Sequence, residues 1–250
     1  MYFNTHTHLN STELYPDRDM YIKRAHEHGV TQMIVVGYDL ESSRLAIEIA
    51  KEYEGIYATV GISPNDCANT TDEDLEEIRT LALSPKVVAI GECGLDYHYD
   101  VPKDKQWAVF QKHIDIAKEL DLPLIIHSRE ASQDTYAFLE KAHHRGIMHC
   151  YSGSYEMAKR YIKIGFYISL GGPVTFKNAK TPKDVVTRVP LDYLLIETDD
   201  PYMAPVPLRG TVNEPANVVY IAEAFAKLKG VDVEEVAKYT NCNAERIFRI

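Results

Sequence analysis

Short apolar runs alternate with longer amphipathic stretches from one end of the chain to the other. The short runs have the length and the β-branched content of buried strands. We predict strands at Tyr2–His6, Gln32–Gly37, Ile56–Gly61, Val87–Gly91, Leu122–Ile126, Gly146–His149, Phe166–Leu170 and Tyr193–Glu197. This alternation is typical of repeated βα units around a parallel sheet.

The amphipathic stretches between the runs predict helices. They are Asp19–His28, Leu40–Tyr53, Asp72–Leu83, Lys103–Leu120, Ser132–His144 and Tyr155–Ile164, with Pro215–Lys229 and Val233–Phe248 as terminal helices. Eight strands, each followed by a helix or loop, in 250 residues predict a (β/α)8 TIM barrel. No linker or internal repeat interrupts the pattern, so we expect residues 1–250 to form a single domain.

The composition agrees with that fold and limits the cellular location and the partners that we expect. The chain is 45% hydrophobic and 26% charged, as expected of a globular domain with a large core. It has no apolar run of 18 residues and no basic segment followed by an apolar one at its N-terminus. The four cysteines form no CxxC pair. We therefore expect a cytoplasmic monomer with no membrane contact, no disulfide framework and no stable protein partner.

The formal charge of -10 argues against a protein that coats nucleic acid with a broad basic face. It does not exclude a phosphate substrate. Remote carboxylates are screened beyond about 8 Å at physiological salt. Divalent cations at a cleft would set the local sign of the potential.

Candidate chemistry begins in the first predicted strand, at Thr5-His6-Thr7-His8. Alternate side chains of a strand share a face, so His6 and His8 point the same way and form half of a metal site. The pair His26 and His28 has the same spacing, but it lies at the end of a predicted helix. Helical geometry separates those two rings, and we expect them in solvent.

Four more potential ligands follow predicted strands: Glu92, His127, His149 and Asp199. The carboxyl ends of barrel strands meet on one face, where the chemistry of this fold occurs. Two carboxylates about 4 Å apart would repel by around 4 kcal/mol at an effective dielectric near 20, and cations would relieve that repulsion.

Six ligands exceed what one tetrahedral ion needs, whereas two ions that share a carboxylate would use all six. We assign one ion to His6, His8, Glu92 and Asp199, and the other to Glu92, His127 and His149. The ligand types suit zinc, manganese or magnesium. Asp199 is the candidate to orient a water molecule and accept its proton, so we name Asp199 and Glu92 as catalytic.

Several motifs resemble those of the TatD family of metal-dependent deoxyribonucleases. They are Thr5-His6-Thr7-His8, Val60-Gly61-Ile62-Ser63-Pro64, Gly91-Glu92-Cys93-Gly94-Leu95-Asp96-Tyr97, His127-Ser128-Arg129, His149-Cys150-Tyr151-Ser152-Gly153, Thr175-Phe176-Lys177-Asn178-Ala179, Glu197-Thr198-Asp199-Asp200-Pro201 and Arg209-Gly210-Thr211-Val212-Asn213-Glu214-Pro215. The resemblance implies a TIM barrel of the metallo-dependent hydrolase superfamily, a divalent metal centre on the same six residues, and hydrolysis of phosphodiesters in DNA, often from a 3′ end.

The chain departs from that family at Ser63, where members usually carry a histidine close to the substrate. A serine hydroxyl can donate to a phosphate oxygen but cannot hold the positive charge of an imidazolium. We therefore expect the substrate preference or the rate of hydrolysis to differ from that of members with the histidine. Tyr151, where phenylalanine is common, adds a hydroxyl near the site.

Further substrate contacts are candidates with structural alternatives. Arg129 could clamp a phosphate or pair with a nearby carboxylate such as Glu92 or Glu197. Arg209, in a proline-rich loop, could do the same or pair with Glu214.

The loop that holds Asp96, Tyr97, His98 and Tyr99 is expected to overhang the cleft, and Tyr97 could stack a base or anchor the loop. Lys177, Lys180 and Lys183 could form a basic rim, although a solvated face is the simpler interpretation.

Two other functions stay open. The same metal centre could hydrolyse amides or esters, including the ester of aminoacyl-tRNA, because an activated water attacks acyl carbon as well as phosphorus. A non-enzymatic barrel is disfavoured because all six ligand positions are filled. Only Ser63 keeps that alternative open.

Overall fold

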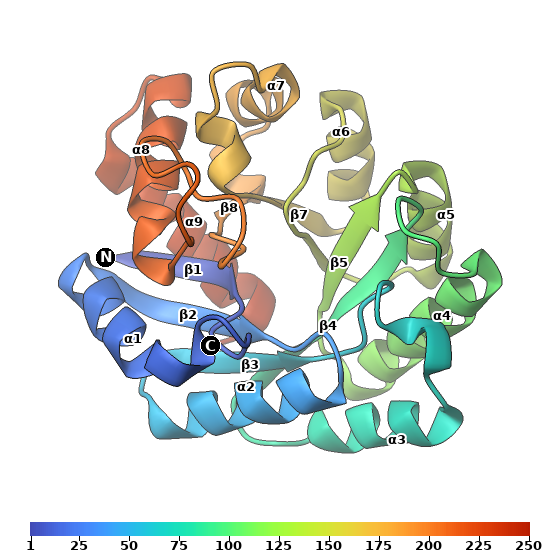
Figure 1. The fold of residues 1–250 in the computed structure, drawn as a ribbon. Coiled ribbons are helices and arrows are strands. Elements are labelled where there is room, and N and C mark those ends of the chain that lie inside the picture. Colours follow the sequence, from blue (N-terminus) through green and yellow to red (C-terminus); the bar gives the residue numbers. More distant parts are fainter.

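The computed structural model describes residues 1–250 and contains one parallel sheet of eight strands in the order β1 to β8. The strands are β1 Tyr2–Thr7, β2 Val30–Val36, β3 Ile56–Val60, β4 Val87–Asp96, β5 Leu124–Arg129, β6 Gly146–Met148, β7 Phe166–Leu170 and β8 Leu194–Ile196. Figure 1 shows the strands around a central axis with the helices outside them. The prediction of a (β/α)8 TIM barrel is confirmed.

The structure has nine α-helices, of which α1 to α8 lie outside the strands and α9 covers one end of the barrel. They are α1 Arg18–Glu27, α2 Leu40–Glu52, α3 Asp72–Leu81, α4 Lys103–Leu120, α5 Ser132–Ala142, α6 Tyr155–Lys163, α7 Lys180–Arg188, α8 Val218–Lys229 and α9 Val233–Phe248. The sequence pattern did not predict α7, which buries only Val185 and Val186 and has a proline in its first turn. As expected, His26 and His28 at the end of α1 are exposed.

The barrel is nearly closed where β8 meets β1, and side chains bridge that seam. The Asn4 amide donates to the Thr198 hydroxyl at 2.7 Å, and its oxygen accepts the Thr198 backbone N–H at 3.1 Å. The backbone N–H of Asp199 then donates to the His6 carbonyl at 3.1 Å. The seam therefore sets the position of Asp199 relative to the histidines of β1.

The opposite, N-terminal end of the barrel is filled with apolar side chains and covered by α9. Phe248 from α9 lies 6.1 Å from the Phe3 ring, and the Asn241 side chain accepts the Phe3 N–H at 3.0 Å. This packing closes one end of the barrel, so a ligand can approach only from the carboxyl ends of the strands.

Two strands run farther than their apolar cores predict. β4 extends to Asp96 and β5 to Arg129, and the two remain paired at Gly94 opposite His127 and Asp96 opposite Arg129. Gly94 permits this pairing: its φ is +138°, and a Cβ there would lie 2.1 Å from the His127 carbonyl oxygen. Glu92, Gly94 and Asp96 consequently share one face of β4.

No helix of the protein is both long enough and apolar enough to cross a membrane. The cysteines form no disulfide; Cys67 and Cys93 are buried, Cys150 is partly buried and Cys242 is exposed.

Candidate metal centre

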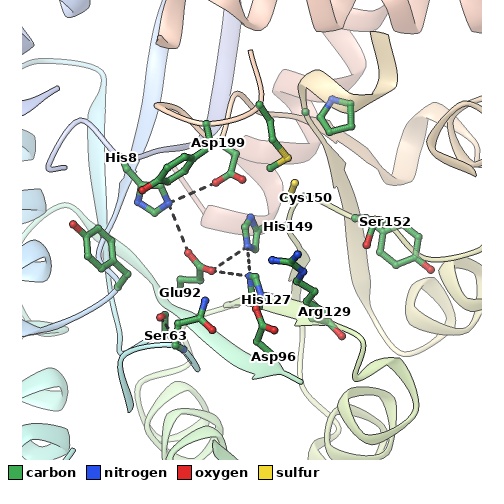
Figure 2. Close-up of a pocket in the computed structure, with 18 of the residues that line it drawn as sticks. His8, Ser63, Glu92, Asp96, His127, Arg129, His149, Cys150, Ser152 and Asp199 are labelled. Atoms are coloured by element: carbon green, nitrogen blue, oxygen red, sulfur yellow. Dashed lines mark hydrogen bonds and ion pairs between the residues drawn. The ribbon is translucent and has the colours of Figure 1, made fainter. Parts of the chain in front are cut away.

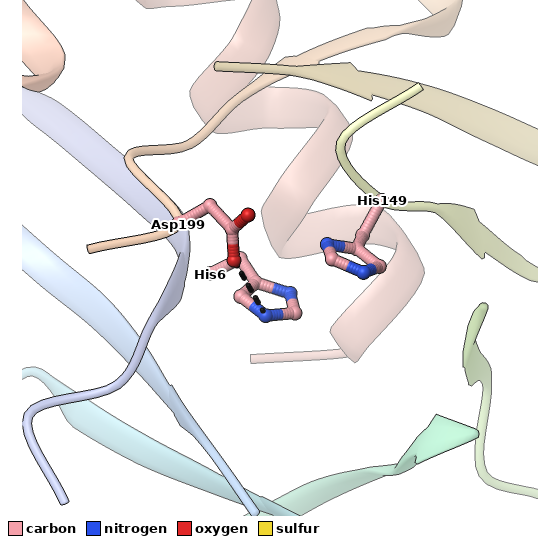
Figure 3. A group of neighbouring side chains, drawn as sticks. All are labelled: His6, His149 and Asp199. Carbon is pink, nitrogen blue, oxygen red and sulfur yellow. Dashed lines mark ion pairs between the residues drawn. The ribbon is translucent and has the colours of Figure 1, made fainter. Parts of the chain in front are cut away.

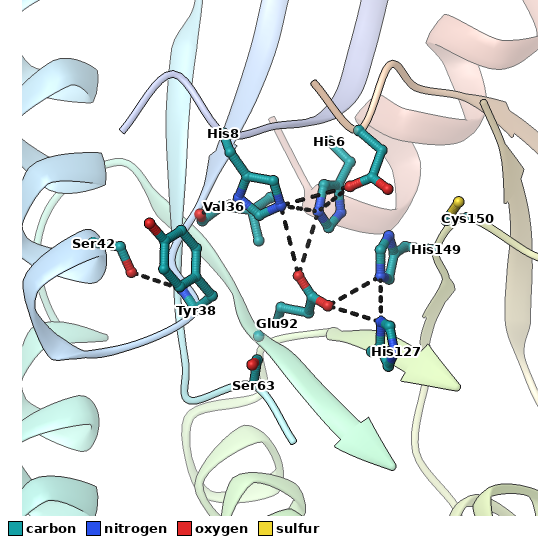
Figure 4. Close-up of polar contacts among 12 residues, drawn as sticks. His6, His8, Val36, Tyr38, Ser42, Ser63, Glu92, His127, His149 and Cys150 are labelled. Atoms are coloured by element: carbon teal, nitrogen blue, oxygen red, sulfur yellow. Dashed lines mark hydrogen bonds and ion pairs between the residues drawn. The ribbon is translucent and has the colours of Figure 1, made fainter. Parts of the chain in front are cut away.

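Four of the predicted ligands converge at the seam between β8 and β1. The Nε2 atoms of His6 and His8 lie 3.2 Å apart. Each lies 3.6 Å from Oδ1 of Asp199 and 3.7 Å from Oε2 of Glu92. Figure 4 shows both rings directed at the Glu92 carboxylate.

The other two ligands approach the second oxygen of Glu92. Oε1 of Glu92 lies 3.0 Å from Nδ1 of His127 and 3.2 Å from Nε2 of His149. These two ring nitrogens are 3.3 Å apart. Glu92 therefore stands between two donor groups and offers one carboxylate oxygen to each (Figure 2).

A third grouping combines His6, His149 and Asp199, whose ligand atoms lie within 4.8 Å of one another. Figure 3 shows the two imidazole rings face to face. Their centroids are 4.1 Å apart and their planes differ by 12°. The lone pairs of parallel rings lie in parallel planes, so they do not converge on one ion. This geometry favours placing His6 and His149 on different ions.

The donor separations fit metal binding. Four ligands about 2.0–2.1 Å from an ion at tetrahedral angles would lie about 3.3–3.4 Å from one another. The separations that involve a histidine nitrogen in the two groups range from 3.0 to 3.7 Å. Imidazole and carboxylate are also the ligand types that zinc and manganese accept.

Acceptor groups lie behind three of the rings, and those behind His8 and His127 are within hydrogen-bond distance. Nδ1 of His8 lies 3.1 Å from the Val36 carbonyl oxygen, and Nε2 of His127 lies 2.9 Å from Oδ2 of Asp96. Nδ1 of His149 lies 3.6 Å from Oε1 of the buried Glu197. Each ring thus presents its other nitrogen to Glu92 or Asp199, as orienting partners of metal-binding histidines do.

Burial and mutual contact shift the pKa values within the cluster. Burial alone would raise the pKa of the Glu92 carboxyl, but His149 and His127 hold it well below its usual value. Burial, reinforced by His149 and His8, lowers the pKa of His6 well below its usual value. His6 is therefore neutral and Glu92 ionised, which are the forms that bind metals. Despite burial, the neighbouring carboxylates raise the pKa values of His8, His127 and His149, so a metal that binds these rings must displace protons.

The cluster forms the floor of a cavity of about 680 Å³ at the carboxyl ends of the strands. Its acidic lining residues are Glu13, Asp66, Glu92, Asp96 and Asp199. Arg129 is the only arginine or lysine in the lining. Metal ions would therefore have to supply most of the positive charge that an anionic substrate requires.

Comparison with known proteins assigns the chain to a family. A family model described as TatD related DNase matches residues 3–249. The chain belongs to the TatD family. Its members include metal-dependent hydrolases, so the coarse chemistry is metal-dependent hydrolysis.

Individual relatives cover the whole chain. A Bacillus subtilis protein named uncharacterized metal-dependent hydrolase YabD is 49% identical over 254 residues, covering 100% of each chain. A Salmonella typhimurium protein named 3'-5' ssDNA/RNA exonuclease TatD is 32% identical and covers 99% of each chain. The crystal structure of YjjV, a TatD homologue from Escherichia coli K12, superposes with a TM-score of 0.95 at 29% identity, covering 100% of this chain and 98% of that one.

Ser63, which stands where the family usually has histidine, lines the cavity but its hydroxyl is already engaged. It donates to Oδ2 of Asp66 at 2.6 Å and accepts the Asn65 backbone N–H at 3.2 Å. Ser63 and Asp66 together therefore place a carboxylate in this part of the cavity lining.

Arg129 remains a candidate phosphate ligand. Its exposed guanidinium lines the cavity and is directed toward its floor (Figure 2). It forms no ion pair with Glu92 or Glu197, and its Cζ lies 5.5 Å from the centroid of the Tyr99 ring. The salt-bridge alternative for this residue is wrong.

The structure places two other candidate contacts outside the cavity. Tyr97 follows Asp96 onto the outer face of β4, where its hydroxyl donates to Asp134 at 2.6 Å and Lys103 lies 3.8 Å from its ring centroid. Tyr97 anchors the loop and does not line the cavity. Tyr99, two residues on, is the loop's aromatic lining residue.

Arg209 does not line the cavity either. Its guanidinium carbon lies 4.2 Å from the centroid of the Phe176 ring. The expected partner Glu214 instead accepts from Arg24 at 2.6 Å, so the predicted pair with Arg209 is wrong.

The proposed basic rim after β7 is absent from the cavity lining. Lys180 and Lys183 lie in α7, and the Lys183 ammonium donates to the carbonyls of Phe176 and Lys177. The structure therefore agrees better with lysines on a solvated face than with a basic rim that contacts the substrate.

Sequence reasoning missed Asp96 as a partner of the cluster. Its side chain is fully buried, and it was expected on an overhanging loop. The signal was present in the alternation of β4, because Asp96 lies four residues beyond Glu92 and so on the same face.

Proposed function

We propose that the protein is a two-metal phosphodiesterase that removes nucleotides from the 3′ end of single-stranded DNA. The observation that carries the proposal is the position of Glu92, whose two oxygens face two separate groups of ligands. Such a bridge suits a pair of ions that clamp the attacking and leaving oxygens of a displacement at phosphorus. The exonuclease name of a relative that is 32% identical supports the same substrate class.

The protein's own residues have distinct roles in this proposal. When bound, the ions supply Lewis acidity that lowers the pKa of a water molecule and offsets charge on the phosphate. Asp199 orients the attacking water and accepts its proton. Arg129 binds a non-bridging phosphate oxygen through its planar guanidinium. Asp96 holds His127 in one tautomer.

The shape of the cavity supports a strand end as the substrate. A volume of about 680 Å³ falls within the range of about 300–1,000 Å³ that is usual for small-ligand pockets. One or two unpaired nucleotides fit such a volume, whereas a duplex does not. The apolar packing under α9 closes the far end of the barrel, so a strand cannot thread through it.

The direct test uses a single-stranded oligonucleotide labelled at its 5′ end and the protein supplied with Mn²⁺ or Mg²⁺. We expect a ladder that shortens from the 3′ end, loss of activity with a chelator, and little digestion of a blunt duplex. Asp199→Asn should abolish the ladder while circular dichroism stays unchanged. An intact strand under every metal condition would reject the proposal.

One observation favours a second candidate, hydrolysis of a carboxylic ester such as aminoacyl-tRNA. Glu13 and Asp66 add negative charge to a cavity whose only arginine or lysine is Arg129. These carboxylates would favour an ammonium group in the cavity, such as the α-amino group that an aminoacyl ester carries next to its scissile bond. Parallel assays with p-nitrophenyl esters, p-nitrophenyl amides and aminoacyl-tRNA separate the two functions.

A further inference from the structure

Two tyrosine rings are exposed at the mouth of the metal cavity. Tyr99 is 53% exposed and Tyr202 is 59% exposed, and both line the cavity. Aromatic rings of this size are usually buried, because each can remove 150 Å² or more from water. Their exposure beside a candidate active site calls for a ligand that covers them.

The Tyr99 ring is held in place by its neighbours. His98 meets it edge to face, with centroids 5.1 Å apart and planes at 85°. The His98 ring is itself fixed by Glu130, whose carboxylate lies 2.9 Å from Nδ1. The Arg129 guanidinium lies 5.5 Å from the ring centroid. One ring therefore stands next to the single cationic side chain that the cavity offers to a phosphate.

Tyr202 is fixed through its backbone. Its N–H donates to the Asp199 carbonyl at 3.1 Å, and its carbonyl accepts from the Asn213 amide at 2.8 Å. This second ring is thus tied to the residue proposed to accept the proton from water. Partial burial, and then the carboxylates of Glu13 and Asp199, raise the pKa of the Tyr202 hydroxyl.

The two tyrosines come from opposite sides of the barrel. Tyr99 follows β4 and Tyr202 follows β8, and these strands are four places apart in the eight-stranded order. The metal ligands lie on the floor between them. A strand whose terminal phosphate reaches the floor would therefore carry its adjoining bases past both rings.

We propose that Tyr99 and Tyr202 form an aromatic rim that stacks the unpaired bases next to the scissile phosphate. This inference rests on the proposed function and names the feature of the substrate that the protein recognises. Every base has a π-face, so such a rim accepts any sequence but requires bases that are not already paired. Stacking also explains how an acidic protein, with Arg129 as the only arginine or lysine in its cavity, could hold a nucleic-acid strand without a row of basic side chains.

The test compares Tyr99→Leu and Tyr202→Leu with the wild type on three substrates: a single-stranded trinucleotide, the same backbone with abasic sites, and thymidine 5′-p-nitrophenyl phosphate. Each substitution should raise KM for the trinucleotide about tenfold, because stacking on one aromatic side chain contributes about that much. KM for the abasic strand should not change, and kcat should stay within about twofold of wild type. Tyr99→Trp should preserve the affinity for the trinucleotide.

Tyr193→Leu is the matched control. Tyr193 is 41% exposed but precedes β8 at the opposite end of the barrel, so its loss should leave all three KM values unchanged. Binding is also measured without turnover, by fluorescence anisotropy of a labelled trinucleotide on manganese-loaded protein that carries Asp199→Asn. Adding either leucine substitution to that protein should weaken binding by the same factor.

The outcomes separate the inference from the function on which it rests. Hydrolysis of the trinucleotide with unchanged KM and unchanged binding in both leucine variants would overturn the aromatic rim and leave the nuclease proposal standing. Failure of the wild type to cleave any phosphodiester would overturn the nuclease proposal, while tyrosine-dependent anisotropy would still support the rim. Equal losses on the intact and abasic strands would show that the rings do not recognise bases.

Discussion

His127 and Asp96 form a partly buried hydrogen bond, with 2.9 Å between Nε2 and the carboxylate oxygen Oδ2. A carboxylate accepts and does not donate, so the imidazole carries its proton on Nε2. In the neutral ring, which metal binding requires, Nδ1 then keeps its lone pair; this atom lies 3.0 Å from Oε1 of Glu92. The pair thus selects the tautomer that can bind a metal.

Asp96→Asn should therefore weaken binding at one of the two proposed metal positions. An amide has no fixed preference for accepting this proton, and loss of such an orienting partner typically costs about 10- to 100-fold in metal affinity. Calorimetric titration of the metal-free protein with Zn²⁺ or Mn²⁺ measures the effect. Asp134→Asn, which removes a carboxylate from the Tyr97 hydroxyl outside the cavity, is the control. Identical affinities in Asp96→Asn and wild type would contradict the orienting role.

Arg129→Ala should lower kcat/KM for an oligonucleotide by about ten- to a hundredfold, since a charge-assisted hydrogen bond contributes about 1.5–3 kcal/mol. Arg129→Lys should restore part of the loss, because it keeps the charge without the bidentate geometry. Steady-state kinetics on one labelled oligonucleotide provides both values.

The control for that series is Arg160→Ala. Arg160 lies on the outer layer with its guanidinium 3.8 Å from the Tyr136 ring centroid, so its loss should not change turnover. If Arg129→Ala retains the wild-type rate, Arg129 does not bind the phosphate.

Particular residues show how far the sequence alone could reach. His6 and His8 are two apart in a strand, and the other four ligands follow apolar runs, Asp199 three residues after its run ends. Strand parity and barrel topology were therefore enough to predict that the six lie together. These are properties of the backbone pattern, which local sequence largely determines.

The substrate contacts were harder to predict because they depend on where strands stop and on side-chain pairing. Continuation of β4 to Asp96 turned Tyr97 outward and left Tyr99 at the cavity. Glu214 paired with Arg24, which is 190 residues away in the sequence, and so was not available to Arg209. The spacing of residues within a motif predicts neither the end of β4 nor the partner of Glu214.

Gly94→Ala should destabilise the protein by about 3 kcal/mol or more. The new Cβ would lie 2.1 Å from a backbone oxygen of β5, at a φ of +138° that side chains rarely adopt. Gly210→Ala is the control, because its φ is also positive at +88° but no atom lies within 4 Å. Its cost should be about 1 kcal/mol. Urea unfolding measures both, and equal losses would show that the contact with β5 does not matter.

His113 should make stability depend on pH through the mildly acidic range. Burial lowers its pKa from 6.5 to about 4. Its Nε2 accepts the Ile62 N–H at 2.9 Å, which only the neutral ring can do. The folded state therefore binds fewer protons than the unfolded state between those values. The stabilisation is complete above pH 6.5 and is lost as pH falls toward 4, by about 3 kcal/mol in all.

Urea unfolding of chelator-treated protein across that range tests the effect of His113. His113→Gln should be less stable at pH 7.5 and should lose less stability on acidification than wild type. His26→Gln, at an exposed position, should follow the wild-type curve. Parallel curves for His113→Gln and wild type would mean that His113 does not titrate as its burial implies.

Anomalous scattering from a crystal of the protein grown with Mn²⁺, recorded with the metal content of the same preparation, tests the two-metal centre most directly. We predict two peaks, one among His6, His8 and Asp199 and the other beside His127 and His149, with a Glu92 oxygen next to each. A fully loaded crystal with a single peak, or with peaks that Glu92 does not join, would contradict the account.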